Sequence, residues 1–246
     1  MTVVESPTAA LTTEQIDTLS TAELAGLIDH TLLTATATAE HIATLCDQAT
    51  AHRTASVCVN PFWVPTAVAQ LEDSPVAVCS VVGFPLGATT TWAKATEAQQ
   101  AVAAGATEID MVINLGALHA GDDHTVIADI AQVVEATKSI NDSALVKVIV
   151  EIGALTGPEG NLSTNLLTRA CQAAEEAHAD FVKTSTGFGY GPATRQAVTV
   201  MRQAVSDRLG VKASGGIKTR QSALQMLHAG ANRLGCSATL AILERN

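Results

Sequence analysis

The chain has 246 residues, of which 47% are hydrophobic and 15% are charged. This composition can bury a large core and excludes a disordered protein, and the length is typical of one large α/β domain. The net charge of −10 argues against a general nucleic-acid binder, which would normally present a basic face. It still allows a small anionic ligand, because a local cluster of lysines can reverse the potential in a cleft.

The cysteines and the first residues indicate a reducing compartment. The five cysteines are scattered and form no C-x-x-C pair, which is typical of free thiols rather than of disulfides or a structural zinc site. Residues Met1 to Leu11 lack the basic start and apolar core of a signal peptide. No uncharged apolar stretch reaches the roughly 18 residues that a membrane helix needs. We therefore expect a cytoplasmic protein without a membrane span.

Short β-rich runs alternate with alanine-rich helical stretches along the chain. A helix is expected first, over Thr13–Leu24, ahead of the first strand, and its Ser20-Thr21-Ala22-Glu23 is a possible capping box for a following turn. The eight predicted strands are Leu27–Leu32, Thr54–Asn60, Val76–Phe84, Thr107–Asn114, Leu145–Ile152, Asp180–Thr186, Gly210–Ser214 and Asn232–Gly235. The predicted helices between and after them are Ala39–His52, Pro61–Leu71, Thr90–Ala104, Asp122–Ser139, Leu162–His178, Pro192–Leu209, Thr219–Ala229 and a last one from Ala238 to the end.

This alternation predicts parallel strands that are covered by helices. The strands are nearly continuous apolar runs, as expected when both faces of a sheet are buried. In the first helix after a strand, apolar residues recur at helical spacing on one face, at Ile42, Leu45, Cys46 and Ala49. Eight β-then-α units indicate an α/β fold, a single (β/α)₈ TIM barrel with an additional N-terminal helix, as one domain over residues 1–246. A doubly wound open sheet is the alternative, but it would usually show fewer units and a nucleotide fingerprint.

Three of the six lysines lie in apolar runs that we predict as strands, namely Lys147, Lys183 and Lys212. Lysine is depleted in strands and is rarely fully buried. A buried ammonium costs free energy unless it is paired or loses its proton, and the neutral amine is a nucleophile. The placement of these lysines indicates a cationic site built for amine chemistry.

In such a barrel, functional residues collect at the C-terminal ends of the strands and in the loops that follow. Polar residues that interrupt the apolar runs there are candidates, although any one of them is as often a satisfied structural group. The convergence of three lysines and an aspartate favours function over a buried salt bridge. The candidates are Asp29, Thr31, Cys58, Asn60, Asp110, Asn114, Lys147, Glu151, Lys183, Thr184, Ser185, Thr186, Lys212, Ser214 and Ser237.

Lysine chemistry assigns roles to the central candidates. A desolvated amine beside another cation has a lowered pKa and can attack a carbonyl to form a Schiff base. The iminium then withdraws electrons, so an adjacent carbon–carbon bond can break or form without a metal or an added cofactor. Lys183 fits the nucleophile, Lys212 the neighbouring cation and Asp110 the group that shuttles protons. Lys147 fits better as a structural ion-pair partner of Asp110 or Glu151.

Small residues and hydroxyls after the last three strands predict a phosphate site. Barrels often bind phosphate at the loops after strands seven and eight, through backbone N–H groups. A glycine pair on its own would indicate no more than a tight turn, but its position in the barrel favours phosphate. The residues expected to bind substrate are Thr186, Gly187, Gly215, Gly216, Gly235 and Ser237.

Metal and nucleotide chemistry find little support in the sequence. The seven histidines form no H-x-H or H-x-x-x-H cluster, so a metal-dependent aldolase is not expected. Neither a Walker loop nor G-x-G-x-x-G occurs, since Gly187, Gly189 and Gly191 have the wrong spacing. We therefore expect neither a metal nor a cofactor.

Six blocks of the sequence resemble those of the deoxyribose-phosphate aldolases, a class I aldolase family. Each block alone is weak evidence, but the combination is highly specific and covers nearly the whole chain. The blocks are LIDHTL from Leu27, SVCVNP from Ser56, EIDMVIN from Glu108, FVKTSTGF from Phe181, VKASGGI from Val211 and NRLGCS from Asn232.

The resemblance implies an enzyme of deoxynucleoside catabolism that reversibly cleaves 2-deoxy-D-ribose 5-phosphate to D-glyceraldehyde 3-phosphate and acetaldehyde. It implies that Lys183 forms the Schiff base with acetaldehyde, and that Asp110 and Lys212 donate and accept protons. The sequence departs from the family in one respect, because some members have a C-terminal tail whose last tyrosine assists proton transfer. Here the last residue is Asn246 and the single tyrosine is Tyr190. Proton transfer at the enamine carbon must then rely on ordered water and the pair of Asp110 and Lys212, or on another group.

Two other functions stay open at this point. Another class I barrel aldolase or transaldolase, acting on a longer sugar phosphate, would be distinguished by substrate profiling. A non-catalytic sugar-phosphate-binding barrel would bind substrate but resist reductive trapping. For the aldolase we expect small-molecule partners, a sugar phosphate and acetaldehyde, with neither nucleic acid nor membrane. If the chain forms a homo-oligomer, a dimer is the expected form.

Overall fold

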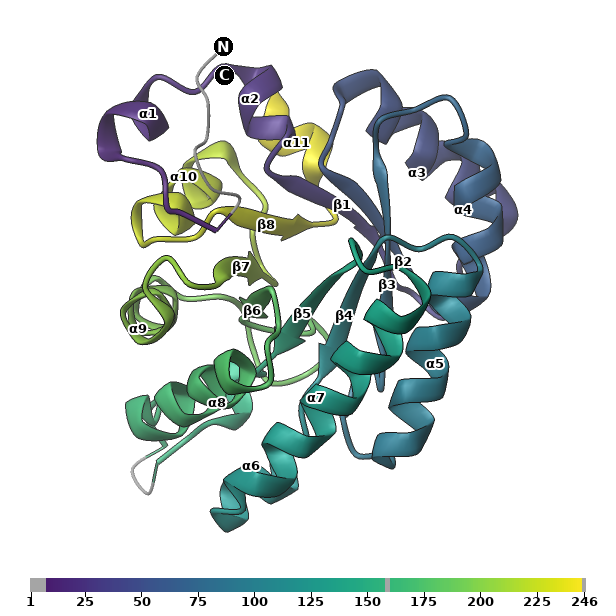
Figure 1. Cartoon of the computed structure of the whole chain (residues 1–246). Coiled ribbons are helices and arrows are strands. Elements are labelled where there is room, and N and C mark those ends of the chain that lie inside the picture. The colour runs from purple at the N-terminus through teal and green to yellow at the C-terminus, as the bar shows by residue number, and fades with distance from the viewer. Residues whose placement is uncertain (1–7, 158–159, 245–246) are drawn as a thin grey trace.

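The computed structural model describes residues 8–157 and 160–244. Eight parallel strands pair in chain order, and the eighth pairs with the first, so the sheet closes into a barrel (Figure 1). This confirms the predicted (β/α)₈ barrel. The strands are β1 Ile28–Leu32, β2 Ser56–Val59, β3 Ala77–Val82, β4 Glu108–Val112, β5 Leu145–Ile149, β6 Phe181–Lys183, β7 Gly210–Ser214 and β8 Arg233–Cys236.

Helices surround the strands on the outside of the barrel (Figure 1). Two short 3-10 helices, η1 Pro61–Trp63 and η2 Ile152–Ala154, follow β2 and β5. The α-helices are α1 Thr13–Asp17, α2 Thr21–Ala25, α3 Ala39–His52, α4 Val64–Gln70, α5 Thr91–Ala103, α6 Leu115–Ala120, α7 Asp123–Ile140, α8 Thr164–Glu176, α9 Arg195–Val205, α10 Arg220–His228 and α11 Thr239–Leu243. No helix of the described part of the chain is long and apolar enough to cross a membrane.

Strand β4 shows how the apolar runs build two layers. All five of its residues are buried. Ile109 and Met111 belong to the hydrophobic core that the helices cover. Because side chains alternate along a strand, Glu108 and Asp110 point to the other face, which is the barrel interior. The same alternation brings polar side chains from several strands to one place inside the barrel.

Helix α3 forms as its sequence predicts. Thr38 caps it, because its hydroxyl accepts a hydrogen bond from the backbone N–H of His41, and the His41 ring accepts in return from the N–H of Thr38. The apolar face that the sequence predicts is the buried face, with Ile42, Leu45, Cys46 and Ala49 inside.

The N-terminal helix differs from its prediction. Instead of one helix over Thr13–Leu24, two short helices, α1 and α2, lie ahead of β1. The Ser20 hydroxyl accepts a hydrogen bond from the N–H of Glu23, and the Glu23 carboxylate accepts from the N–H of Ser20. This reciprocal cap starts a new helix and therefore ends the old one at Asp17.

Other boundaries also differ from the predictions. The sequence analysis missed α6, which Asn114 caps by accepting a hydrogen bond from the N–H of Ala117. Strand β6 ends at Lys183 and not at Thr186, because the Thr184 hydroxyl bonds the backbone N–H and C=O of Ser214, the last residue of β7. Helices α8 and α9 begin two and three residues later than predicted, each after a hydroxyl cap.

Candidate active site

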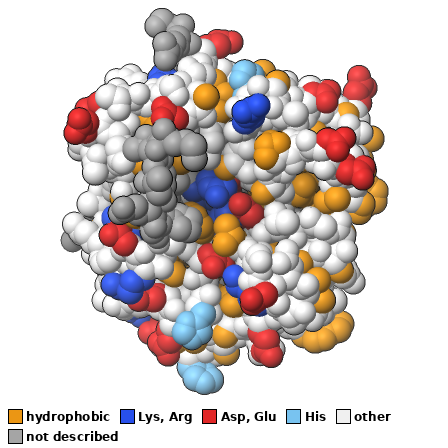
Figure 2. Space-filling view, turned by 45° about the horizontal axis from the view of Figure 1, so that its top comes forward, with side chains coloured by type: hydrophobic (Ala, Val, Ile, Leu, Met, Phe, Trp, Pro, Cys, Tyr) orange, Lys and Arg blue, Asp and Glu red, His pale blue; other side chains and the backbone are white. Residues whose placement is uncertain are grey.

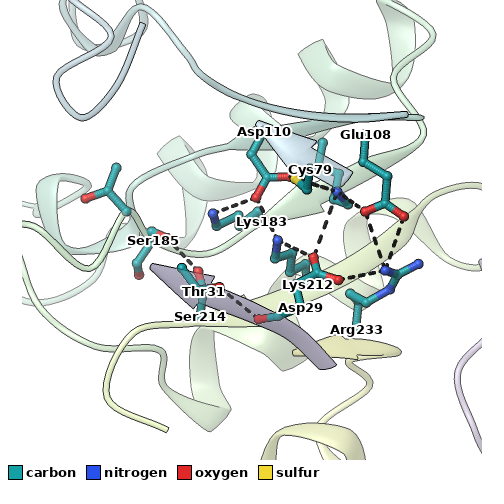
Figure 3. Close-up of polar contacts among 12 residues, drawn as sticks. Asp29, Thr31, Cys79, Glu108, Asp110, Lys183, Ser185, Lys212, Ser214 and Arg233 are labelled. Atoms are coloured by element: carbon teal, nitrogen blue, oxygen red, sulfur yellow. Dashed lines mark hydrogen bonds and ion pairs between the residues drawn. The ribbon is translucent and has the colours of Figure 1, made fainter. Parts of the chain in front are cut away.

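Lys183 and Lys212 meet at one carboxylate oxygen inside the barrel. The amines of both residues lie 2.7 Å from Asp110 Oδ2, as Figure 3 shows. The three side chains come from β6, β7 and β4, so the contact closes across the barrel interior. The structure therefore brings together the three residues that the sequence predicts to be catalytic.

The strand register explains why the two lysines are neighbours. Lys183 pairs with Lys212 across β6 and β7 at the same level, so both side chains point inward together. The stem of Lys212 passes over Gly235, where an added Cβ would lie 3.1 Å from Lys212 Cε and 2.9 Å from Ser214 Cβ. Gly235 thus makes room for this lysine, in addition to its predicted place in the substrate site.

The other oxygen of Asp110 is also occupied. Lys147 Nζ donates to Asp110 Oδ1 at 2.9 Å, and the thiol of Cys79 lies 3.3 Å from the same oxygen. Lys147 also lies 2.6 Å from Glu108. The prediction that Lys147 is an ion-pair partner of Asp110 agrees with these contacts. The alternative partner, Glu151, binds the backbone N–H and hydroxyl of Thr186 instead.

A second group of charges lies next to the first. Arg233 Nη1 is 2.7 Å from Asp29 Oδ1 and 3.3 Å from Glu108 Oε1, and Asp29 also pairs with Lys212. These residues and the first group form one continuous set of contacts, which we call the ion-pair network (Figure 3). Its members are Asp29, Glu108, Asp110, Lys147, Lys183, Lys212 and Arg233.

Opposite charges outweigh burial at Asp110 and Lys212. Burial alone would raise the pKa of Asp110, but Lys147, Lys183 and Lys212 hold it well below its ordinary value. Burial alone would lower the pKa of Lys212, but Asp110 and Asp29 hold it above its ordinary value. At neutral pH Asp110 is therefore a carboxylate and Lys212 an ammonium.

A cavity of about 510 Å³ opens above Lys183. A second cavity of about 530 Å³ lies beside α1 and α2, but no lysine or arginine is among the described residues that line it. The cavity at Lys183 includes every residue that the sequence predicts to bind substrate, so the structure collects them around one space. They are Thr186, Gly187, Gly215, Gly216, Gly235 and Ser237.

Two loops around this cavity need glycine. Gly215 and Gly216 have φ of +89° and +75°, and Gly187 has φ of +82°, a region that side chains disfavour. Thr186 fixes the start of its loop, because its hydroxyl donates to Glu151 at 2.5 Å and accepts from the N–H of Phe188 at 3.1 Å. Thr186 is thus placed at the cavity wall with its hydroxyl already engaged.

Among the described residues, one group of three could offer ligands to a metal, namely Cys58, Cys79 and Asp110. Both carboxylate oxygens of Asp110 and the sulfur of Cys79 already contact lysine amines, at 2.7 to 3.4 Å. A divalent cation there would have to displace those ammonium groups. The donor set therefore suits the lysines better than a metal ion.

Glu108 and Arg233 are the members of the network that sequence reasoning missed. Both are the first residues of their strands, whereas the site residues were predicted at the C-terminal ends of the strands. A signal was available, because Glu108 alternates with Asp110, and every second residue of a strand shares a face. Asp29 was a candidate without a role, and its contacts with Lys212 and Arg233 give it one.

The model of the DeoC/LacD aldolase family matches residues 24–245. A deoxyribose-phosphate aldolase of Bacillus cereus (strain AH187) is 50% identical over 220 residues, which are 89% of this chain and 94% of the relative. A deoxyribose-phosphate aldolase of Carboxydothermus hydrogenoformans is 50% identical over 226 residues, which are 92% of this chain and 96% of the relative.

A solved structure agrees with these relatives. The tetrameric deoxyribose-phosphate aldolase of Aeropyrum pernix superposes with a TM-score of 0.83 at 32% identity, covering 95% of this chain and 97% of its own. The chain belongs to the DeoC/LacD family of aldolases.

Proposed function

We propose that this DeoC/LacD family aldolase reversibly cleaves 2-deoxy-D-ribose 5-phosphate to D-glyceraldehyde 3-phosphate and acetaldehyde, through a Schiff base on Lys183. One observation supports it above the others: a single oxygen of Asp110 lies 2.7 Å from the amines of both Lys183 and Lys212. The oxygen can take a proton from one amine while it holds the other as an ammonium, as Schiff-base formation requires.

The contacts support Lys183, among the three lysines, as the nucleophile. The ion-pair network holds three carboxylates and four basic groups, so it is electrically neutral when one basic group carries no proton. Lys183 contacts one carboxylate of the network, whereas Lys147 contacts three and Lys212 and Arg233 contact two each. Lys183 is also the lysine of the three that lines the cavity. It is therefore the amine that is free to attack.

The reaction then follows from these positions. Neutral Lys183 attacks C1 of the open-chain sugar, Asp110 accepts the proton that the amine loses, and Lys212 supplies a proton to the oxygen that leaves as water. A base takes the proton of the C3 hydroxyl and the C2–C3 bond breaks, because the iminium accepts its electron pair. Glyceraldehyde 3-phosphate leaves, the enamine is protonated at C2, and water releases acetaldehyde from Lys183.

An assay of cleavage tests this function. Product formation from 2-deoxyribose 5-phosphate should exceed that from longer ketose phosphates, and prior chelation should leave the rate unchanged, because amines and a carboxylate do the chemistry. Preference for a longer sugar phosphate would indicate another class I aldolase. Binding of sugar phosphate without turnover would indicate a binding protein, and activity that is lost on chelation and restored by zinc would refute the Schiff base.

Ser237 should contact the phosphate and not the reacting carbons. It lines the cavity after β8, as do the glycines that follow β7. Ser237→Asp should raise KM for deoxyribose 5-phosphate, because a carboxylate repels phosphate, while the lost hydrogen bond alone is worth about 1–3 kcal/mol. Unphosphorylated deoxyribose is the control, and its kcat/KM should stay near the wild-type value. Equal weakening of both substrates would place the phosphate elsewhere.

The broader expectations about the chain belong to the same proposal. We propose one domain that acts in the cytoplasm and associates as a homo-oligomer. The family model supports the first point, since it extends over residues 24–245. Exposed apolar side chains after β2 and β3 support association, with Phe62, Leu86 and Trp92 exposed by 79%, 63% and 77%. The Aeropyrum pernix relative is a tetramer, so the dimer stays a prediction.

A further inference from the structure

We propose that Glu108 and Arg233 act as positioning residues that, without contacting Lys183, control whether its amine is protonated. Neither is among the described residues that line the substrate cavity. The inference rests on the proposed Schiff-base function, in which Lys183 must be neutral to attack. The pH range in which the enzyme is active then depends on two residues that do not contact the substrate.

Two lines of contact connect this pair to Asp110, the carboxylate that Lys183 contacts. Glu108 pairs with Lys147 at 2.6 Å, and Lys147 donates to Asp110 at 2.9 Å. Arg233 pairs with Asp29 at 2.7 Å, and Asp29 pairs with Lys212, which donates to Asp110 at 2.7 Å. Glu108 and Arg233 also contact each other at 3.3 Å, so the two lines form a closed set (Figure 3).

The charges of the pair are poorly screened by water. The side chain of Glu108 is 6% exposed and that of Arg233 is 16% exposed. Arg233 also lies over the ring of Phe181, with its guanidinium carbon 5.7 Å from the ring centre. Burial would lower the pKa of Arg233, but Asp29 and Glu108 hold it above its ordinary value, so the guanidinium stays charged. On one face of the molecule, basic and acidic side chains lie together near the centre (Figure 2).

Charge balance makes the two residues act in opposite directions. With Lys183 neutral, the network has three negative and three positive charges. Removing the negative charge of Glu108 leaves a surplus of positive charge, which disfavours a proton on Lys183. Removing the positive charge of Arg233 leaves a surplus of negative charge, which favours that proton.

Other titratable groups surround Lys183, and all of them are common to the variants that we compare. These groups determine the pH at which wild-type activity rises. They do not determine in which direction that pH moves when the charge of Glu108 or of Arg233 is removed. Glu151 accepts hydrogen bonds from the backbone N–H and the hydroxyl of Thr186. The groups outside the pair, from every strand or loop around Lys183, are Asp29, Cys58, Cys79, Asp110, Lys147, Glu151, Lys212 and Lys218.

The test compares the pH dependence of kcat/KM for 2-deoxyribose 5-phosphate. The acid limb of this profile is the range in which kcat/KM rises with pH. In Glu108→Gln the acid limb should move to lower pH, and in Arg233→Met to higher pH, each by on the order of one pH unit. At a pH within the wild-type acid limb, the Arg233→Met variant should therefore be several-fold slower than wild type, and it should recover when the pH is raised. Reductive trapping of acetaldehyde on Lys183 should follow the same two shifts.

Charge-conserving variants provide the matched controls. Arg233→Lys and Glu108→Asp should keep the acid limb within a few tenths of a pH unit of wild type, even where packing changes lower the rate. The double variant Glu108→Gln/Arg233→Met removes one charge of each sign, so its limb should return toward wild type. Thermal unfolding of each variant reports folding. If one of the two single variants does not fold, the shift of the other one, measured against its own charge-conserving variant, is the test.

Shifts of both single variants in the same direction, or rates lowered equally at every pH, would overturn the inference and indicate a structural role. These outcomes are separate from failure of the proposed function. A wild-type chain that neither cleaves the substrate nor traps acetaldehyde would refute the Schiff base itself.

Discussion

Replacing Lys183 by Met should abolish both cleavage and covalent trapping. The side chain of Met fills a similar volume, but it carries no amine, and neither neighbouring lysine can take over the attack. Lys147 and Lys212 are fully buried and are held as ammonium groups by two or more carboxylates. The rate should fall to the uncatalysed background, on the order of 10⁶-fold or more below wild type.

Borohydride trapping measures the same prediction directly. Incubating the wild-type chain with acetaldehyde and borohydride should add one ethyl group to the peptide that contains Lys183, and the Lys183→Met variant should gain none. Lys138→Met is the matched control, because Lys138 pairs with Asp180 on the outside of the barrel, and it should keep both activity and label. An ethyl group on Lys147 or Lys212 with Lys183 unmodified would show that the nucleophile has been assigned wrongly.

The fold could be predicted because its signals are local. Apolar runs of strand length, a helical face such as that of Ile42 and Leu45, and eight repeats of one unit need no knowledge of distant contacts. The N-terminal helix was predicted wrongly because a hydroxyl cap at Ser20 outweighs the continuing helical pattern. Element ends were imprecise for the same reason, since single side-chain hydrogen bonds such as that of Thr184 decide them.

The candidate site could be predicted only in part. Lysines in apolar runs are conspicuous, so Lys147, Lys183 and Lys212 were found. Schiff-base formation also needs a carboxylate that shuttles protons, and Asp110 interrupts one of the apolar runs. Glu108 shares a strand face with Asp110, which is a local signal, but its contacts, and those of Arg233, depend on the strand register across the barrel. That register places β8 beside β1 and β7, and no local pattern reveals which side chains then face each other.

Activity should be nearly as sensitive to replacement of Lys212 as to replacement of Lys183, but for a different reason. The Lys212 ammonium places a positive charge beside the nucleophile, and it can donate a proton and regain one through Asp110, which an apolar side chain cannot do. Lys212→Leu should lower kcat by about 10²–10⁴-fold. Its remaining activity should require higher pH, because a lost cation lets Lys183 hold its proton more readily.

Lys212→Arg separates charge from proton transfer. A guanidinium keeps the positive charge but does not release a proton in proteins, and it must fit a fully buried site over Gly235. We therefore expect a loss of kcat that is close to that of Lys212→Leu, with an acid limb that stays near the wild-type position. Removing one partner from a buried pair can cost about 3–5 kcal/mol of stability, so unfolding is measured alongside. A Lys212→Arg variant with wild-type kcat would show that this residue acts through its charge alone and that protons reach the substrate by another path.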